Sequence, residues 1–329
     1  MKIIVDAFGG DNSPGAVISG AYMAAKEFGD IILVGDEDKI REYAKNNSIA
    51  IDDVNIEIID AKPVIEIEDD PQMILREKMD CSMAVGLRTL SEGDGDAFVS
   101  AGSTGALVVG ATFIAKRLKG IKRAALSPIM PTDTGPLILT DAGANLDCRP
   151  EMLVQFGIMA SCYMQRVMGI ESPRVGLLNV GSESTKGRSL DMDAYKLLQK
   201  APVNFCGNVE ARELPWGVCD VVVTDGFTGN IALKLYEGLG GYFSNSLKGM
   251  FSGFPGAVAA ASIMPRIKAF RNKMNTTDIG GAMLMGISKP VIKAHGNSDD
   301  KSFYRTICQA RDCVEGNFIE EISNALKEV

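Results

Sequence analysis

The sequence predicts an α/β fold with a largely parallel sheet. Strand-like and helix-like runs alternate from one end of the 329-residue chain to the other, which is typical of that class. In addition, five short apolar runs each stop at a loop rich in glycine, hydroxyl and amide side chains. Ligands bind outside the carboxyl ends of parallel strands, so such loops predict one polar pocket whose backbone N–H groups suit an anion. The five loops begin at Asp6, Ala101, Asp141, Asn179 and Asp225.

The first sixty residues contain three predicted strands. Residues 3–5, 31–34 and 56–59 are short and rich in β-branched side chains, which favour strands. Pro14 opens a helix after the first strand, because proline suits the first turn of a helix. Residues 38–46 predict a polar helix on the surface.

Helices and strands continue to alternate further along the chain. Apolar side chains recur at helical spacing over residues 79–90, so a helix leads up to a strand at Ala97. Residues 151–168 predict a long, apolar-rich helix, and residues 193–199 a shorter one. No repeat, low-complexity tract or flexible linker interrupts the pattern, so residues 1–329 are expected to form a single domain of one or two lobes.

One segment departs from the alternation. Residues 231–250 predict a long helix with an apolar stripe, and a Gly-Phe-Pro-Gly turn at 253–256 breaks it. Residues 257–274 predict a second helix, interrupted or kinked at Pro265. Together they predict a protruding helical hairpin over about residues 231–274, apolar at its tip and basic behind it. The pattern leaves three roles open: a core hairpin, a dimer bundle, or a membrane contact through residues 250–264.

Composition excludes several classes of protein. A net charge of −8 argues against nucleic-acid binding, which needs a basic face. The seven cysteines form no CxxC pair and there is one histidine, so we expect no metal site and a reducing compartment. The amino terminus reaches Asp6 too early for the apolar segment of a signal peptide, and no apolar stretch could span a bilayer. We therefore expect a cytoplasmic protein that attaches at most to a membrane surface.

Familiar cofactor and hydrolase motifs are absent from the sequence. There is no GxGxxG after the first strand and no GxxxxGK[ST], so nothing supports a bound dinucleotide or nucleoside triphosphate. GxSxG is also absent, which weakens a serine-hydrolase interpretation. We expect no cofactor.

Three side chains carry the candidate chemistry. Lys186 lies in a small-residue loop after a strand, where its ammonium could neutralise a phosphate or simply face solvent. His295 follows the strand at residues 290–292 and is either a general acid, base or donor, or a structural histidine. Asp225 begins the fifth loop and either takes part in the chemistry or caps the following helix.

Eight ordered stretches resemble one known family nearly end to end, the bacterial acyl-carrier-protein:phosphate acyltransferases of phospholipid synthesis. They are Asp6-Ala-Phe-Gly-Gly-Asp11, Ser100-Ala-Gly-Ser-Thr-Gly-Ala106, Asp141-Ala-Gly-Ala-Asn145, Leu177-Leu-Asn-Val-Gly181 with Lys186 and Gly187, Gly207-Asn-Val-Glu210, Asp225-Gly-Phe-Thr-Gly-Asn230, Gly280-Gly-Ala282 and Lys293-Ala-His-Gly296. Two positions depart from the family pattern. Ser103 replaces the usual asparagine, and Cys81 precedes Ser82 in place of a serine pair, which leaves fine substrate contacts in doubt.

The resemblance implies a fold and a reaction. The fold is a three-layer α/β/α sandwich like that of the isocitrate/isopropylmalate dehydrogenase class, in a homodimer that associates peripherally with membrane. The reaction joins a long-chain acyl group from acyl carrier protein to inorganic phosphate. Phosphate is substantially dianionic near neutral pH and a thiolate leaves readily, so catalysis needs mainly positioning and oxyanion stabilisation. The basic run at residues 116–123 is a candidate docking surface for the acidic carrier.

Motif matching and residue chemistry together assign roles within this reaction. Lys186 is expected to neutralise phosphate charge, and His295 to polarise the thioester or protonate the departing sulfur. Asp225 is expected to orient one of these groups or the phosphate. The expected pocket lining is Gly102, Ser103, Thr104, Gly105, Asn145, Asn179, Gly181, Thr228, Gly229, Asn230 and Ser298.

Two other interpretations stay open. The nearest is a phosphate acetyl- or butyryl-type transferase that uses short acyl-coenzyme A, which a comparison of acyl donors would separate. The other is a membrane-recruited scaffold without catalysis whose pocket senses an anion, against which the placement of Lys186 and His295 speaks. A dehydrogenase is disfavoured because the dinucleotide motif is absent.

Overall fold

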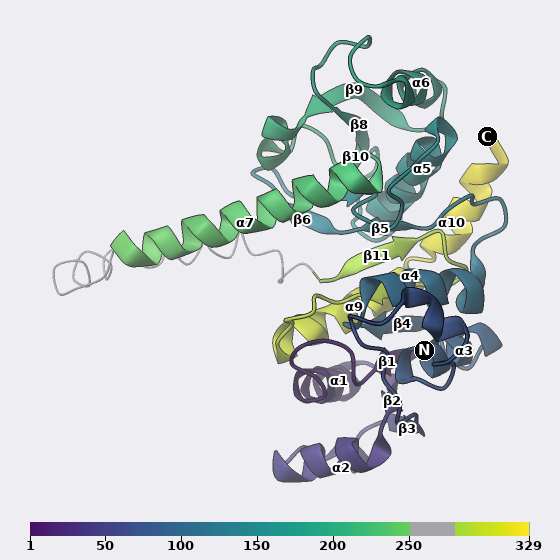
Figure 1. Cartoon of the computed structure of the whole chain (residues 1–329), viewed down its shortest axis with the longest axis vertical. Helices are drawn as coiled ribbons and strands as arrows, with labels where there is room; N and C mark the ends of the chain where they lie inside the picture. Colours follow the sequence, from purple (N-terminus) through teal and green to yellow (C-terminus); the bar gives the residue numbers. More distant parts are fainter. Residues whose placement is uncertain (251–279, 329) are drawn as a thin grey trace.

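Two β-sheets with helices packed around them make up the computed structural model, which describes residues 1–250 and 280–328 (Figure 1). The first lobe contains a seven-stranded sheet in the order β3 (Ile56–Asp60), β2 (Asp30–Gly35), β1 (Lys2–Asp6), β4 (Ala97–Ser100), β12 (Val291–Lys293), β11 (Ala282–Met285) and β5 (Ala125–Ser127). The second lobe contains a five-stranded sheet in the order β6 (Ile129–Pro131), β7 (Pro136–Thr140), β10 (Val221–Val223), β8 (Arg174–Asn179) and β9 (Asn204–Glu210). The predicted α/β class with mostly parallel strands is confirmed, with the strands divided between two sheets.

Antiparallel pairing occurs where the two sheets approach one another. In the first sheet β11 pairs antiparallel with both β12 and β5, and in the second β6 pairs antiparallel with β7. Only Pro128 separates β5 from β6, so the chain passes from one sheet to the other within a single extended run. Side chains also join the sheets, because the Ser127 hydroxyl donates to Thr140 Oγ1 at 2.8 Å.

The helices cover both faces of the sheets. They are α1 (Gly15–Glu27), α2 (Glu37–Asn46), α3 (Ser82–Glu92), α4 (Thr104–Gly110), α5 (Pro150–Arg166), α6 (Ser189–Leu198), α7 (Gly226–Met250), α9 (Asp300–Glu315) and α10 (Phe318–Ala325). A π-helical turn (Ala111–Lys116) extends α4, and short 3₁₀ turns occupy Ile51–Asp53, Pro71–Leu75, Ala211–Trp216 and Leu326–Glu328.

Successive side chains of a strand point to opposite faces of the sheet, which explains the layers. Ile3 and Val5 of β1 belong to a core shared with α1, α5 and α9, and this core reaches strands of both sheets. Ile4, between them, belongs to a second core with α3 and α4 on the opposite face. A third core lies on the far face of the second sheet, under Leu233 and Tyr236 of α7. Helix, sheet and helix therefore form three layers in each lobe.

Helix boundaries follow local capping. The helix predicted from residue 231 begins five residues earlier, at Gly226, because the Asp225 carboxylate accepts the Thr228 N–H. The helix predicted to start at residue 79 begins at Ser82. The polar helix predicted at residues 38–46 is α2, capped by the Asp36 side chain, which accepts the Lys39 N–H.

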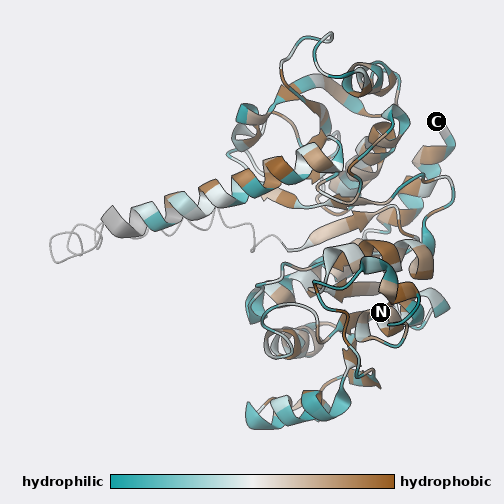
Figure 2. Ribbon diagram, in the orientation of Figure 1, coloured by the Kyte–Doolittle hydropathy of each residue, from teal (hydrophilic) through white to brown (hydrophobic). Residues whose placement is uncertain are grey.

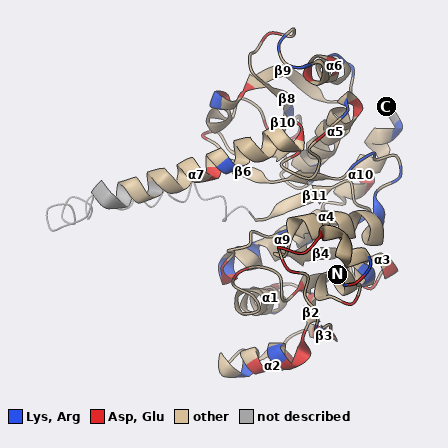
Figure 3. Ribbon diagram, in the orientation of Figure 1, with Lys and Arg blue, Asp and Glu red and all other residues tan. Residues whose placement is uncertain are grey.

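Helix α7 is the first limb of the predicted hairpin and projects from the body of the molecule (Figure 1). The second limb predicted at residues 257–274 lies outside the described residues, as does the turn at residues 253–256. Apolar residues line α7 and charges along it are few, as Figures 2 and 3 show. Among the described helices, none is long and apolar enough to cross a membrane.

Candidate active site

The ends of β1, β4 and β12 bring three loops of the first lobe together. The Asp11 N–H donates to the Gly296 carbonyl at 2.7 Å, and the Asn12 amide donates to the carbonyl of Ser298 at 3.2 Å. Gly10 adopts a φ of 96°, and a Cβ there would lie 2.8 Å from Ala101 Cβ. These contacts place the loop that carries His295 directly against the first and second glycine loops.

A buried carboxylate organises this junction. Asp6, the last residue of β1, accepts the hydroxyls of Ser82 and Ser100, each at 2.7 Å, and the Phe8 N–H at 3.3 Å. Burial raises the pKa of Asp6 above its ordinary value, while the Ser100, Ser82 and Phe8 hydrogen bonds act in the opposite direction. The Ser100 hydroxyl also accepts the Gly102 N–H at 3.0 Å. Asp6 therefore fixes the start of the second loop.

The predicted residues of the second loop have distinct structural roles. The Ser103 hydroxyl caps α4 by accepting the Ala106 N–H at 3.5 Å, and Thr104 is the first residue of that helix. A Cβ on Gly105 would lie 2.7 Å from Pro71 Cγ, and one on Gly102 would meet a methionine side chain at the same distance. Both glycines are needed for close packing.

His295 and Ser298 differ in exposure. The His295 side chain is exposed and makes no hydrogen bond with any described residue, so its imidazole is free to meet a ligand. Ser298 is buried, its N–H donates to the His295 carbonyl at 3.1 Å, and its own carbonyl accepts Asn12. Ser298 thus closes the histidine loop.

The ends of β7 and β10 form a second junction around Asp141. Asp141 Oδ1 accepts the N–H groups of Leu126, Gly143 and Ala144 at 2.9–3.1 Å. Its Oδ2 accepts both the backbone and the side-chain N–H of Asn145, at 2.7 and 2.8 Å. Burial raises the pKa of Asp141, against the effect of these bonds. Because Leu126 lies on β5, this carboxylate also ties the two lobes together.

Asn145, predicted to line the pocket, is held by this junction. Its side-chain amide donates to Asp141 and, at 2.7 Å, to the Ala124 carbonyl. Its carbonyl accepts the Gly226 N–H at 2.8 Å. Asn145 therefore links the third glycine loop to the start of α7.

Asp225 and Thr228 lie together at the start of α7. Asp225 accepts the backbone N–H of Thr228 at 2.9 Å and its hydroxyl at 3.0 Å. Arg188 donates to Asp225 at 2.5 Å and also pairs with Asp191. Burial alone would raise the pKa of Asp225, but the bonds from Thr228 and the Arg188 charge lower it below its ordinary value. Asp225 is thus an ionised, 2% exposed helix cap.

The rest of the fifth loop packs against the third. A Cβ on Gly229 would overlap the Asp141 carbonyl oxygen, so only glycine fits there. The Asn230 side chain lies close to Gly143, because a Cβ on that glycine would be 3.7 Å from Asn230 Cγ. These residues hold the start of α7 against the end of β7.

The fourth loop presents Lys186 to solvent. Asn179, at the end of β8, accepts the Val180 N–H at 2.8 Å and donates to the Lys186 carbonyl at 3.1 Å. Gly181 is buried beneath the aliphatic part of Lys186, since a Cβ there would lie 3.2 Å from Lys186 Cγ. Within the described chain the Lys186 ammonium is exposed and pairs with no carboxylate.

The structure thus gathers most of the predicted residues into two junctions, one in each lobe, whereas Asn179, Gly181 and Lys186 contact one another on the fourth loop. In the described part of the chain, no hydrogen bond or ion pair joins Lys186 or His295 to Asp225. Sequence reasoning gave no role to the buried carboxylates Asp6 and Asp141 or to Arg188. The sequence pattern could have indicated the two aspartates, because each directly follows a strand-like run and begins a glycine loop.

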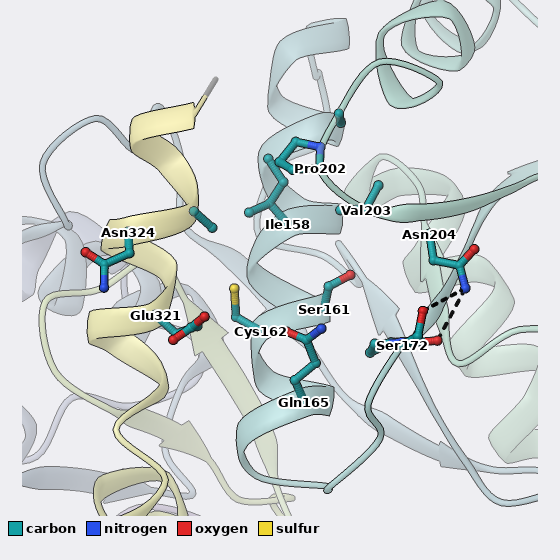
Figure 4. A pocket seen from close by; sticks show the side chains of 13 residues that line it. Ile158, Ser161, Cys162, Gln165, Ser172, Pro202, Val203, Asn204, Glu321 and Asn324 are labelled. Carbon is teal, nitrogen blue, oxygen red and sulfur yellow. Dashed lines mark hydrogen bonds between the residues drawn. The ribbon is translucent and has the colours of Figure 1, made fainter.

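A separate cavity of about 510 Å³ lies between α5, α10 and the segment before β9 (Figure 4). Its lining includes Ile158, Ser161, Cys162 and Glu321, and none of the predicted site residues. No group of histidine, cysteine and acidic side chains suited to a metal ion occurs among residues 1–250 and 280–328.

Solved structures share this fold. EutD phosphotransacetylase from Staphylococcus aureus matches with a TM-score of 0.65 and 20% identity, over 95% of this chain and 94% of that one. A 4-hydroxythreonine-4-phosphate dehydrogenase from Burkholderia phymatum matches with a TM-score of 0.51 and 14% identity, over 94% of this chain and 97% of that one. The predicted likeness to a dehydrogenase-type fold is confirmed.

Sequence comparison identifies the family. A phosphate acyltransferase from Bacillus cereus (strain B4264) is 44% identical over 332 residues, covering 100% of this chain and 99% of the relative. A phosphate acyltransferase from Bacillus pumilus (strain SAFR-032) is 47% identical over 319 residues, covering 96% and 94%. The model of a family described as fatty acid synthesis protein matches residues 1–321. The resemblance inferred from the motifs is confirmed, and the chain belongs to this family of fatty acid synthesis proteins, in which its relatives are phosphate acyltransferases.

Proposed function

We propose that this chain transfers a long-chain acyl group from acyl carrier protein to inorganic phosphate, giving acyl phosphate for phospholipid synthesis. The observation that carries the proposal is the Lys186 ammonium, exposed on the loop after β8 and unpaired with any described carboxylate. An exposed cation on a loop that follows a parallel strand suits a phosphate dianion. The relatives' name, phosphate acyltransferase, supports the coarser reaction, acyl transfer to phosphate.

The proposed reaction needs no covalent enzyme intermediate. A phosphate oxygen attacks the thioester carbonyl carbon, forming the new C–O bond and a tetrahedral oxyanion. The C–S bond then breaks, and the thiolate leaves and takes a proton. Lys186 neutralises phosphate charge, and the exposed His295 imidazole polarises the carbonyl or supplies that proton.

Asp225 acts in this scheme by orientation. Its carboxylate holds the Thr228 backbone and hydroxyl and the Arg188 guanidinium, so it fixes the loop and helix start that face the substrate. The pocket is lined by the predicted glycine and amide loops of both junctions. The lining residues are Gly102, Ser103, Thr104, Gly105, Asn145, Asn179, Gly181, Thr228, Gly229, Asn230 and Ser298.

The decisive test incubates the protein with palmitoyl acyl carrier protein and phosphate and traps acyl phosphate with hydroxylamine. His295→Ala and Lys186→Ala should each lower turnover by about 10²–10³, the cost of losing one group that transfers a proton or stabilises charge in the transition state. Lys200→Ala is the matched control, because Lys200 is another exposed lysine of the second lobe. Near-normal turnover in both folded variants would exclude the assigned roles.

A second candidate is transfer between short acyl-coenzyme A and phosphate. It is favoured by the fold shared with the Staphylococcus aureus phosphotransacetylase. Turnover of acetyl- or butyryl-coenzyme A well above that of palmitoyl carrier protein would establish it. Absence of any acyl phosphate from either donor would favour a non-catalytic, membrane-recruited scaffold.

The basic run at residues 116–123 is the proposed docking surface for acyl carrier protein. Its Lys116, Arg117, Lys119, Lys122 and Arg123 are exposed, which suits an acidic partner. The double variant Lys119→Glu/Arg123→Glu should associate more slowly with acyl carrier protein, and the association rate should depend less on salt. The control Lys45→Glu reverses a remote exposed charge on α2 and should change neither the association rate nor its salt dependence. If the control and the double variant had equal effects, this docking surface would be ruled out.

Homodimerisation is proposed to use α7. Six large apolar side chains in its described part are 45–67% exposed, and an apolar stripe of this kind indicates a partner surface. They are Phe227, Ile231, Leu235, Leu239, Tyr242 and Phe243. Leu235→Asp should convert a dimer to monomer in sedimentation equilibrium, and a dimer that persists unchanged would exclude α7 as the interface.

Peripheral membrane contact of a cytoplasmic enzyme is proposed through residues 250–264. Phe251 and Phe254 give this segment apolar side chains, with basic residues further along the chain. Flotation with anionic vesicles should be lost when both become Asp. Unchanged flotation would rule out this contact.

A further inference from the structure

Lys293 stands at the junction of the three loops of the first lobe. It is the last residue of β12 and is partly buried. Its ammonium donates to the carbonyls of Ala101 at 3.1 Å and Ala294 at 2.5 Å. An ammonium has three N–H donors, so one remains, and it has no partner among the described residues.

Lys293 lies near the carboxylates of Asp11 and Asp6 but pairs directly with neither. It forms no ion pair with a carboxylate in the described structure, and the nearby Asp6 already accepts Ser82, Ser100 and a backbone N–H. Burial lowers the pKa of Lys293 to about 8, the charges of Asp11 and Asp6 oppose this, and Lys234 on α7 lowers it further. Lys293 is thus within electrostatic reach of two carboxylates of the first lobe and of one lysine of the second.

An anion would occupy the free donor and pair with the partly buried ammonium. Two carbonyl contacts alone do not require a charged group, whereas a partly buried ammonium is costly unless an anion balances it. Lys293 also adjoins both His295 and the second glycine loop, whose Ala101 carbonyl it holds. The position therefore suits the same anion that the glycine loops serve.

We propose that Lys293 binds the phosphate substrate, donating its third N–H to a phosphate oxygen from the first lobe while Lys186 acts from the second. This inference rests on the proposed transfer of acyl groups to phosphate. It makes the phosphate a bridge between lobes, since each contributes one cation. The two carbonyl bonds fix the ammonium in place before phosphate arrives, which reduces the entropy lost on binding.

The test compares Lys293→Met with Lys289→Met. Lys289 is the matched control, because its ammonium donates to the Gly95 carbonyl at 2.7 Å at the opposite end of the sheet. Two measurements are made: the KM for phosphate in acyl-phosphate formation, and the rise in melting temperature on titrating inorganic phosphate at constant ionic strength without acyl donor. Lys293→Met should raise the phosphate KM roughly tenfold or more and remove most of the thermal shift. Lys289→Met should leave both unchanged.

Lys293→Arg separates binding from loop positioning. Arginine stays charged through the alkaline range, so phosphate affinity of this variant should not fall above about pH 8, whereas that of the wild type should. A folded Lys293→Met variant with a wild-type phosphate KM and thermal shift, but reduced kcat, would overturn the inference and leave Lys293 a positioning residue. If the wild type shifts with phosphate yet forms no acyl phosphate, the proposed function fails while the thermal measurement still decides the role of Lys293.

Discussion

Replacing Asp225 with Asn tests whether this residue works as a charged cap. The Asp225 carboxylate is 2% exposed and accepts three hydrogen bonds, two from Thr228 and one from Arg188. In the variant, the amide oxygen can keep the Thr228 backbone N–H. The amide nitrogen then faces the Thr228 hydroxyl and Arg188, and it cannot accept from either.

The magnitude follows from these two lost bonds. Each hydrogen bond to a buried charge contributes about 1.5–3 kcal/mol. The share of Arg188 is smaller, about 1 kcal/mol, because its side chain is 55% exposed and keeps its bonds to Asp191. We expect Asp225→Asn to lower the free energy of unfolding by about 2–4 kcal/mol at pH 7.

Urea denaturation of single and double variants measures this loss. A double-mutant cycle of Asp225→Asn and Arg188→Met should give a coupling energy between the two residues of about 1 kcal/mol. Arg212→Met, which removes an exposed pair with Glu210, should cost less than about 0.5 kcal/mol.

The pH dependence of the stability difference between wild type and Asp225→Asn tests whether the cap is charged. The folded pKa of Asp225 is lowered, so its stabilisation is present above the ordinary value near about 4 and is lost as pH falls below it. The difference between wild type and Asp225→Asn should therefore narrow below about pH 4. A loss under about 0.5 kcal/mol at pH 7, or a difference independent of pH, would refute the charged-cap account.

Three further predictions concern other parts of the chain. Gly229→Ala should cost about 3 kcal/mol or more in thermal denaturation, because its Cβ overlaps the Asp141 carbonyl oxygen. Gly238→Ala, with open space around it on α7, should instead stabilise by about 0.5–1 kcal/mol; a similar effect of the two would contradict the packing. Asp220→Asn should flatten the loss of stability below about pH 4, since hydrogen bonds from Arg174 outweigh burial and lower the pKa of Asp220. Alkylation of exposed Cys206 should begin at a lower pH than that of an ordinary thiol, because its interaction with Cys219 lowers its pKa; a midpoint above about 8.5 would exclude that effect.

The sequence predicted where most strands lie, but it did not predict how they are divided between two sheets. Runs that end in glycine loops identified β1, β4, β7, β8 and β10, because buried parallel strands are continuous apolar segments. The passage between sheets at Pro128 was not predictable, since β5 and β6 are three residues each and read as one run. Which sheet a short strand joins depends on tertiary pairing rather than on its own composition.

The role of Arg188 was not predicted because one of its partners, Asp225, is distant in the sequence. Its contact with Asp225 spans 37 residues, and its local pattern shows only a capping arrangement with Asp191 at the start of α6. Lys186, two residues earlier, stood out because small residues surround it. Among the described residues no carboxylate pairs with the exposed lysine, whereas the neighbouring arginine pairs with two.

The three aspartates at strand ends change how the glycine loops must bind an anion. The sequence suggested backbone N–H groups directed at a ligand, but several of these donate to the loop's own carboxylate. Asp141 alone takes the N–H groups of Gly143, Ala144 and Asn145, and Asp225 takes that of Thr228. These carboxylates make the loops rigid while using donors that a phosphate would otherwise meet. Charge compensation for the substrate must therefore come largely from side-chain cations, which is why one lysine in each lobe carries the proposed phosphate site.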